Sequence, residues 1–133
     1  MDTIIQEPLD DSQAPITLIW LHGLGVDGSD FESFQKELSQ FGGLDNVRMV
    51  LPTAPSRDIS AYKLTMNAWY DLYTENFEEQ EAEDIEGMNQ SASVVTALIE
   101  ELRQKYPTSP IWLGGFSQGA ALALIAGLSQ IPP

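Results

Sequence analysis

The chain has 133 residues and a hydrophobic content of 43%, which is enough for one domain with a core of its own. Its formal net charge of −14 argues against nucleic acid or anionic membrane as a partner, because both would repel it. The absence of cysteine excludes disulfides, thiolate metal sites and a cysteine nucleophile. Residues 1–8 lack the basic and apolar regions of a signal peptide, so we expect a cytoplasmic protein with one domain over residues 1–133.

Two strands and one helix are expected in the first third of the chain. Residues 16–21 form a short apolar run, which predicts a strand buried on both faces. Ser29 and Glu32 have the spacing of a capping box, so we expect a helix to begin there. Its apolar side chains recur at helical spacing, at Phe31, Phe34, Leu38 and Phe41. The next apolar run, residues 47–51, predicts a second strand.

A long connection is expected from residue 53 to about residue 83, because neither helical nor strand periodicity is clear there. Connections of this length within a compact domain usually carry function. Residues 75–86 contain seven acidic side chains and no basic one, which we interpret as a solvated face. A cation site is the alternative, although no spaced ligand pattern supports it.

The last third of the chain predicts a helix, a strand and a second helix. Residues 85–106 repeat apolar side chains at intervals of three and four, and residues 111–114 form an apolar strand. Residues 118–128 are apolar on nearly every side, which predicts a buried helix. The uncharged stretch 110–128 approaches the length of a membrane span, but glycine, serine and glutamine interrupt it, so we expect no span. The alternation of strands and helices indicates an α/β fold with a mostly parallel sheet.

The sequence Gly115-Phe116-Ser117-Gln118-Gly119 lies between the third expected strand and the third expected helix. A G-x-S-x-G motif in this setting is typical of the nucleophile turn of α/β serine hydrolases. The flanking glycines let the backbones of strand and helix approach closely, and the helix N-terminus directs free N–H groups at the reacting centre. We therefore predict that Ser117 is a nucleophile and call residues 115–119 the nucleophile turn.

A second motif, His22-Gly23-Leu24-Gly25, follows the first expected strand, where this architecture places one oxyanion donor. The predicted donors are the main-chain N–H groups of Leu24 and Gln118, worth roughly 3 kcal/mol each in the transition state. His22 is the only histidine and precedes the nucleophile, whereas the usual order places the base after it. We therefore interpret His22 as a residue that braces the backbone, with a role as base as the alternative.

The glycines at positions 23, 25 and 28 also match the dinucleotide-binding pattern G-x-G-x-x-G. Two nearby acids, Asp27 and Asp30, would repel a pyrophosphate, and no acid follows the second strand to hold a ribose. We therefore expect no cofactor and no metal ion, and nucleotide binding is the alternative.

Four blocks of sequence together resemble the phospholipase/carboxylesterase family, which includes bacterial carboxylesterases and acyl-protein thioesterases. The blocks are HGLGVDGSDF (22–31), LPTAP (51–55), AWYD (68–71) and GGFSQGA (114–120). The resemblance extends over residues 16–128 and implies an α/β-hydrolase fold and a cofactor-free hydrolase of carboxylic esters or acyl thioesters. It implies that Ser117 is the nucleophile, that Leu24 and Gln118 donate to the oxyanion, and that Trp69 with nearby apolar residues walls the acyl site.

The sequence departs from the family pattern after Ser117, because no Asp, Glu or His follows that residue. Family members continue further and carry the catalytic Asp and His there, so the resemblance implies an incomplete α/β-hydrolase domain that lacks C-terminal strands and helices. Loss of a triad member costs about 10⁴ to 10⁶ in kcat, so we expect residues 1–133 to be inactive alone. The strand at 111–114 would have an exposed edge, which predicts self-association or a complementary C-terminal fragment. A non-catalytic acyl-binding or assembly remnant of the same fold is the alternative.

Overall fold

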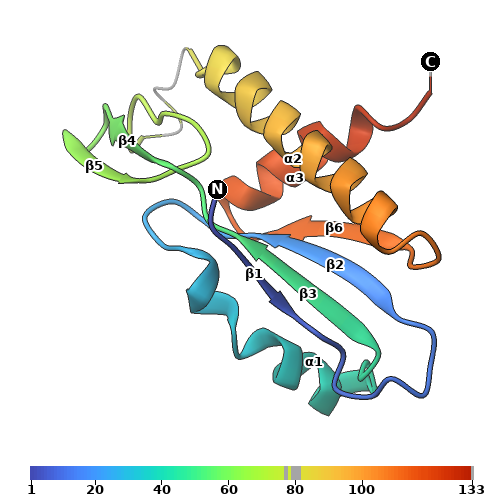
Figure 1. Ribbon diagram of the computed structural model, residues 1–133. Helices are drawn as coiled ribbons and strands as arrows, with labels where there is room; N and C mark the ends of the chain where they lie inside the picture. Colours follow the sequence, from blue (N-terminus) through green and yellow to red (C-terminus); the bar gives the residue numbers. More distant parts are fainter. Residues whose placement is uncertain (77, 79–81, 133) are drawn as a thin grey trace.

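The computed structural model describes residues 1–76, 78 and 82–132. Figure 1 shows a twisted sheet with helices on both faces and a small hairpin beside it. The strands of the four-stranded sheet lie in the order β1 (Thr3–Gln6), β3 (Val47–Pro52), β2 (Ile16–Leu21) and β6 (Ile111–Gly115). Strand β2 is parallel to both of its neighbours, and β1 is antiparallel to β3. The predicted α/β fold with a mostly parallel sheet is therefore confirmed.

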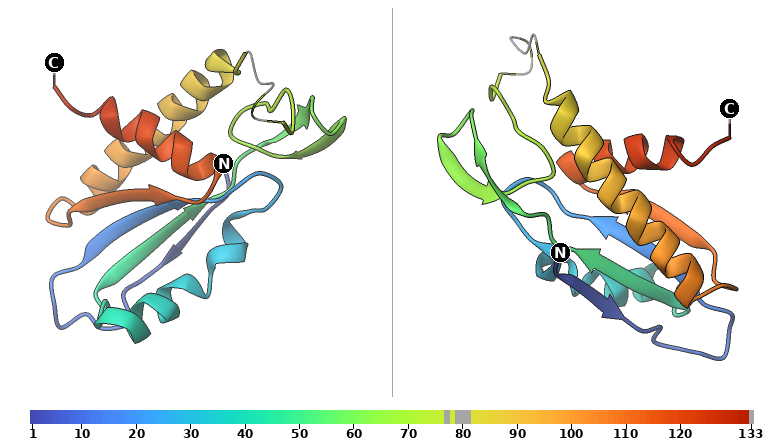
Figure 2. Two further views of the ribbon diagram at one scale, coloured as in Figure 1. Left: turned by 180° about the vertical axis from the view of Figure 1, so that it is seen from behind. Right: turned by 45° about the horizontal axis from the view of Figure 1, so that its top comes forward.

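The two faces of the sheet are covered unequally. The short helix α1 (Phe34–Gly42) covers one face, and the helices α2 (Ile85–Lys105) and α3 (Gln118–Leu128) cover the other (Figure 1). Figure 2 shows α3 lying over β6 and crossing α2, and α3 packs on both. The larger core lies between the sheet and these two helices, and includes Ile19, Leu21, Val50, Val95, Leu98, Leu102 and Leu122. The smaller core, beneath α1, is built on Val47, Met49 and Leu51.

The start of the first helix differs from the prediction. A 3-10 turn, η1 (Gly28–Phe31), comes first, and α1 begins three residues after it. The capping box belongs to Asp27 and Asp30: the Asp27 carboxylate accepts the Ser29 N–H at 2.8 Å, and the Asp30 carboxylate accepts the Asp27 N–H at 2.9 Å. The predicted pair of Ser29 with Glu32 was wrong, because a carboxylate is a stronger acceptor than the hydroxyl two positions later.

Three predictions about burial were also wrong. Strand β2 alternates between buried and half-buried residues, and β3 is the strand buried on both faces. Phe41, expected on the apolar face of its helix, has 90% of its surface exposed. Helix α3 is buried on one side only, since Leu124 and Leu128 are 67% and 64% exposed. Among the described residues β6 is an edge strand that pairs only with β2. Helix α3 therefore packs on β6, β2 and α2 on one side, and no described element covers its other side.

Three short strands were not predicted from the sequence. These are β1 and the hairpin of β4 (Ser56–Ile59) with β5 (Leu64–Asn67), which lies inside the predicted connection. Each has four residues and is too short or too polar to show a period. The acidic run 75–86 lies partly outside the described residues. Of its described acids, Asp84 is half-buried and the others are exposed, namely Glu75, Glu78, Glu83 and Glu86.

Two further observations concern the described residues as a whole. Across residues 1–76, 78 and 82–132, no three His, Cys, Asp or Glu side chains are grouped so that they could hold a metal ion. Over the same ranges, no helix has both the length and the apolar character that crossing a membrane requires.

Candidate active site

The nucleophile turn joins β6 directly to α3. Ser117 is the N-cap of α3 and has φ 54° and ψ −118°, a backbone conformation that residues other than glycine rarely adopt. Such strain costs on the order of 1–3 kcal/mol and persists only where the surroundings impose it. The Phe116 N–H donates to the Leu21 carbonyl at 3.0 Å, which ties the turn to the end of β2. The turn therefore presents an exposed serine hydroxyl at the N-terminus of a helix.

The two glycines of the turn are required by close backbone approach. A Cβ on Gly119 would lie 2.0 Å from the carbonyl oxygen of Leu21, and a Cβ on Gly115 would lie 2.4 Å from the Gly119 carbonyl. Neither distance is compatible with a side chain, and backbone atoms cannot move aside as a flexible side chain can. The expectation that these glycines let strand and helix approach is confirmed.

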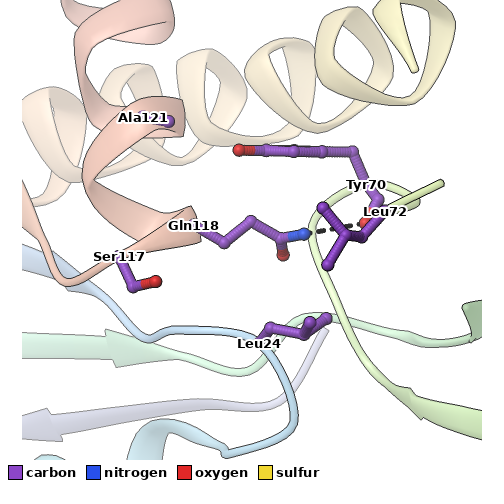
Figure 3. A pocket seen from close by; sticks show the side chains of 6 residues that line it. All are labelled: Leu24, Tyr70, Leu72, Ser117, Gln118 and Ala121. Atoms are coloured by element: carbon purple, nitrogen blue, oxygen red, sulfur yellow. Dashed lines mark hydrogen bonds between the residues drawn. The ribbon is translucent and has the colours of Figure 1, made fainter. Parts of the chain in front are cut away.

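A pocket opens beside the serine (Figure 3). It has a volume of about 330 Å³ and is lined by Leu24, Tyr70, Leu72, Ser117, Gln118 and Ala121. The predicted nucleophile and both predicted oxyanion residues thus lie around one cavity, although they come from two loops far apart in the sequence. Among the residues that the structure describes, neither the Leu24 nor the Gln118 main-chain N–H has a hydrogen-bond acceptor. Both are therefore available to a ligand.

Trp69 does not line this pocket. Its side chain is 1% exposed and lies in the core, where its indole Nε1–H donates to the His22 carbonyl at 2.9 Å. The following residues Tyr70 and Leu72 provide the lining instead. The main-chain N–H of Trp69 donates to Oε1 of Gln118, which does line the pocket. Sequence reasoning singled out Trp69 and counted Tyr70 and Leu72 only among the nearby apolar residues of a long connection.

The only titratable group among the described residues that line the pocket is Tyr70. Burial raises the pKa of its phenol above the ordinary value of 10.0, and the charge of Glu83 adds to this effect. The phenol is therefore neutral at physiological pH and cannot serve there as the base for Ser117.

His22 is fully buried and both of its ring nitrogens are engaged. Its Nε2 accepts the Ala54 N–H at 2.9 Å, so the ring proton lies on Nδ1, which donates to the Gly23 carbonyl at 2.7 Å. Burial lowers the pKa of the imidazole below 6.5, although the Gly23 hydrogen bond opposes this. These contacts agree with the interpretation that His22 braces the backbone, and they leave no nitrogen free for Ser117.

The glycine-rich loop that matches the dinucleotide pattern packs on the nucleophile turn. A Cβ on Gly23 would lie 3.2 Å from Phe116 and 3.5 Å from Ser117. The N-terminus of η1, where a pyrophosphate would sit, is capped by the Asp27 carboxylate, and the Gly28 N–H donates to the Thr53 hydroxyl at 2.9 Å. These donors are therefore already used within the chain.

Comparison with known proteins gives relatives over most of the chain. The family model described as Phospholipase/Carboxylesterase matches residues 2–132. Acyl-protein thioesterase 1 of Eremothecium gossypii is 39% identical over 118 residues, which cover 87% of this chain and 49% of that protein. Acyl-protein thioesterase 1 homolog 2 of Dictyostelium discoideum is 40% identical over 113 residues, which cover 84% of this chain and 50% of that protein. The chain spans about half the length of the curated relatives it matches.

Solved structures agree with the sequence matches. Zea mays acyl-protein thioesterase 2 has a TM-score of 0.73 at 34% identity, covering 94% of this chain and 50% of the other. Arabidopsis thaliana SOBER1 has a TM-score of 0.73 at 26% identity, covering 85% of this chain and 54% of the other. These likenesses confirm the predicted α/β-hydrolase fold. Because the family model extends over nearly all of its residues, the chain belongs to the phospholipase/carboxylesterase family.

Proposed function

We propose that Ser117 is the nucleophile of a hydrolase site for acyl esters or thioesters. The observation that carries this proposal is geometric: a strained, exposed serine at the start of α3 shares one pocket with two main-chain N–H groups that have no acceptor among the described residues. Serine hydrolysis of acyl groups needs this combination of an accessible nucleophile and preorganised donors for the oxyanion.

In the proposed reaction the Ser117 Oγ attacks the acyl carbonyl carbon and gives up its proton to a base. The developing oxyanion accepts hydrogen bonds from the main-chain N–H groups of Leu24 and Gln118, each worth roughly 3 kcal/mol in the transition state. The alcohol or thiol leaves with a proton, and water then hydrolyses the acyl-enzyme. Leu24, Leu72 and Ala121 supply apolar surface for the acyl chain.

Among the described residues that line the pocket, none provides a base for Ser117. His22 has both nitrogens engaged, and no Asp, Glu or His follows Ser117 in the sequence. We propose that residues 1–133 are slow by themselves and that a histidine and an acid from elsewhere complete the site. The edge of β6 offers a place for added structure, since Trp112 is 49% exposed there. A complementary fragment or a second copy would pair at this edge.

The thioesterase names of the relatives favour an acyl thioester as substrate. They do not favour the non-catalytic alternative, in which the fold binds acyl groups without turnover. The retained backbone strain at Ser117 also points to chemistry, because strain of this kind clusters at active sites.

The proposal is tested by supplying the missing base from solution. Residues 1–133 and the Ser117→Ala variant are incubated with p-nitrophenyl butyrate over a series of imidazole concentrations. We expect both to hydrolyse the ester equally without imidazole, and the wild type to gain an imidazole-dependent rate above that of Ser117→Ala. Intact mass spectrometry should detect a butyryl adduct in the wild type only. Equal imidazole-dependent rates and no adduct in either protein would refute Ser117 as the nucleophile.

A further inference from the structure

We infer that the side chain of Gln118 is a positioning residue that holds the wall of the acyl pocket against the nucleophile turn. The wall is the pocket loop, residues 68–72, which contributes Tyr70 and Leu72 to the lining. The inference rests on the proposed function, since it assigns this pocket to the acyl chain. It concerns the carboxamide of Gln118, whereas the proposed oxyanion donor is the main-chain N–H of the same residue.

Both ends of the Gln118 carboxamide bind the backbone of the pocket loop. Its Oε1 accepts the Trp69 N–H at 2.7 Å, and its Nε2 donates to the Tyr70 carbonyl at 2.8 Å, the contact drawn in Figure 3. The residue is only 8% exposed, so water competes little for these bonds. A side chain at this place must therefore both accept and donate, which a carboxylate or an apolar group of similar length cannot do.

The pocket loop has no regular structure of its own. Main-chain hydrogen bonds hold its two ends, from Ala68 to the Pro55 carbonyl and from Ala61 to the Leu72 carbonyl, and side chains from other elements hold the residues between them. The Ser91 hydroxyl of α2 donates to the Trp69 carbonyl, and the Asp84 carboxylate accepts the Asp71 N–H at 2.8 Å. Of these three fastening side chains, Gln118 is the one that also lines the pocket and adjoins Ser117. Its carboxamide therefore links the position of the pocket wall to the position of the nucleophile.

A consequence follows for ligand binding. Loss of the carboxamide removes the two hydrogen bonds that join Trp69 and Tyr70 to α3, so the pocket wall beside Ser117 is held less firmly, although the bonds at the two ends of the loop remain. The main-chain N–H of residue 118 remains with any side chain. We therefore expect substitutions of Gln118 to weaken acyl binding, and thus to raise KM in a completed enzyme, with a much smaller effect on kcat.

The test combines amide hydrogen exchange with binding of octanamide, an uncharged probe with an acyl chain and a carbonyl oxygen. Gln118→Met keeps the length of the side chain and removes both hydrogen bonds. The matched control is Gln130→Met in the segment after α3, whose amide bonds only to Thr96 at 3.3 Å, away from the pocket. We expect about tenfold faster exchange of the Trp69 amide in Gln118→Met, with the Ile19 amide of the central sheet unchanged. Octanamide affinity should fall severalfold in this variant and stay at the wild-type level in Gln130→Met.

A second variant keeps the inference testable if Gln118→Met does not fold. Gln118→Glu retains an acceptor for the Trp69 N–H but turns a second oxygen toward the Tyr70 carbonyl, so octanamide affinity should fall while the Trp69 amide stays protected. Wild-type octanamide affinity in either Gln118 variant, whatever the exchange rates, would overturn the inference. If the wild type itself does not bind octanamide, the proposed acyl site fails, and accelerated exchange at Trp69 in Gln118→Met still supports the fastening role.

Discussion

The nucleophile turn and the pocket loop face the same cavity but are held in place by different means. The turn is shaped by contacts between adjoining backbones, since Gly119 lies against the end of β2 and Phe116 donates to Leu21. The pocket loop is held by side chains from distant parts of the chain, such as Gln118, which is 49 positions from Trp69. Both walls thus rely on contacts between segments that are distant in the sequence, but the turn is held by main-chain contacts and the middle of the pocket loop by side chains.

This difference predicts how a substitution in each region affects stability and binding. A change in the turn meets rigid backbone and should affect the whole fold. A change in the fastenings of the loop should act locally and chiefly on binding.

The largest effect is expected for Gly119→Ala, because its Cβ would lie 2.0 Å from the Leu21 carbonyl oxygen. We expect a loss of about 3 kcal/mol or more in the free energy of unfolding, measured by urea denaturation. Gly127→Ala is the matched control on the same helix, since its Cβ would meet Leu113 at an ordinary 3.8 Å. That control should gain about 0.5–1 kcal/mol from helix propensity. A stable Gly119→Ala would contradict the account of the turn.

The next effect is expected at His22, which lies between the two regions and braces Ala54. His22→Ala removes the acceptor of a buried N–H and should cost about 2 kcal/mol in the free energy of unfolding. Burial lowers the pKa of His22 in the folded state, so the unfolded chain takes up the proton first as the pH falls below 6.5. The stabilising contribution of His22 is therefore complete above pH 6.5 and declines below it.

Denaturation at about pH 7.5 and about pH 5.5 checks this sign. The difference in the free energy of unfolding between wild type and His22→Ala should shrink at the lower pH. A comparison between the two proteins is needed because the protein carries a formal net charge of −14, and acid also weakens repulsion among its carboxylates. A gap that grows on acidification would show that the His22 pKa is raised, contrary to the expectation.

A smaller effect is expected for Asp84→Ala, which acts on the pocket loop. The Asp84 carboxylate accepts the Gly87 N–H at 3.0 Å as the N-cap of α2 and the Asp71 N–H at 2.8 Å. We expect a loss of about 1–2 kcal/mol in the free energy of unfolding and faster amide exchange at Asp71. The exposed Glu86 in the first turn of the same helix is the control, and Glu86→Ala should change stability by less than about 0.5 kcal/mol. Unchanged exchange at Asp71 would argue against the fastening.

The smallest effect is expected for the backbone strain at Ser117. Glycine adopts positive φ without steric cost, whereas alanine does not, so Ser117→Gly should be more stable than Ser117→Ala by about 1 kcal/mol. Thermal unfolding of the two variants measures the difference, and both lack the hydroxyl, so chemistry does not complicate the comparison. Equal stability would mean that the turn relaxes when its serine is replaced.

Much of the sheet and the nucleophile turn could be predicted from the sequence, because their signals are local. The helix predicted over residues 118–128 has the observed bounds of α3, and the strands over residues 16–21, 47–51 and 111–114 agree with β2, β3 and β6 within one residue. The spacing of Gly115 and Gly119 reflects in part a backbone approach within five residues, since a Cβ on Gly115 would meet the Gly119 carbonyl. Such elements can be predicted from sequence because short-range steric contacts and periodic burial determine their conformation.

The resemblance placed Trp69 and nearby apolar residues at the acyl site, but the fastening of the pocket loop could not be predicted, because nothing within residues 68–72 reveals which distant groups hold them. The exposed side of α3 could not be predicted either: its apolar composition indicated burial, but Leu124 and Leu128 are exposed because β6 has one strand partner among the described residues. The sequence by itself determined the order of the three parallel strands β2, β3 and β6 and of the helices between and after them, and the serine at the strand-to-helix turn. Only the tertiary structure decided which side chains fasten the opposite wall of the pocket, since hydrogen bonds between distant segments depend on how the whole sheet and its helices pack.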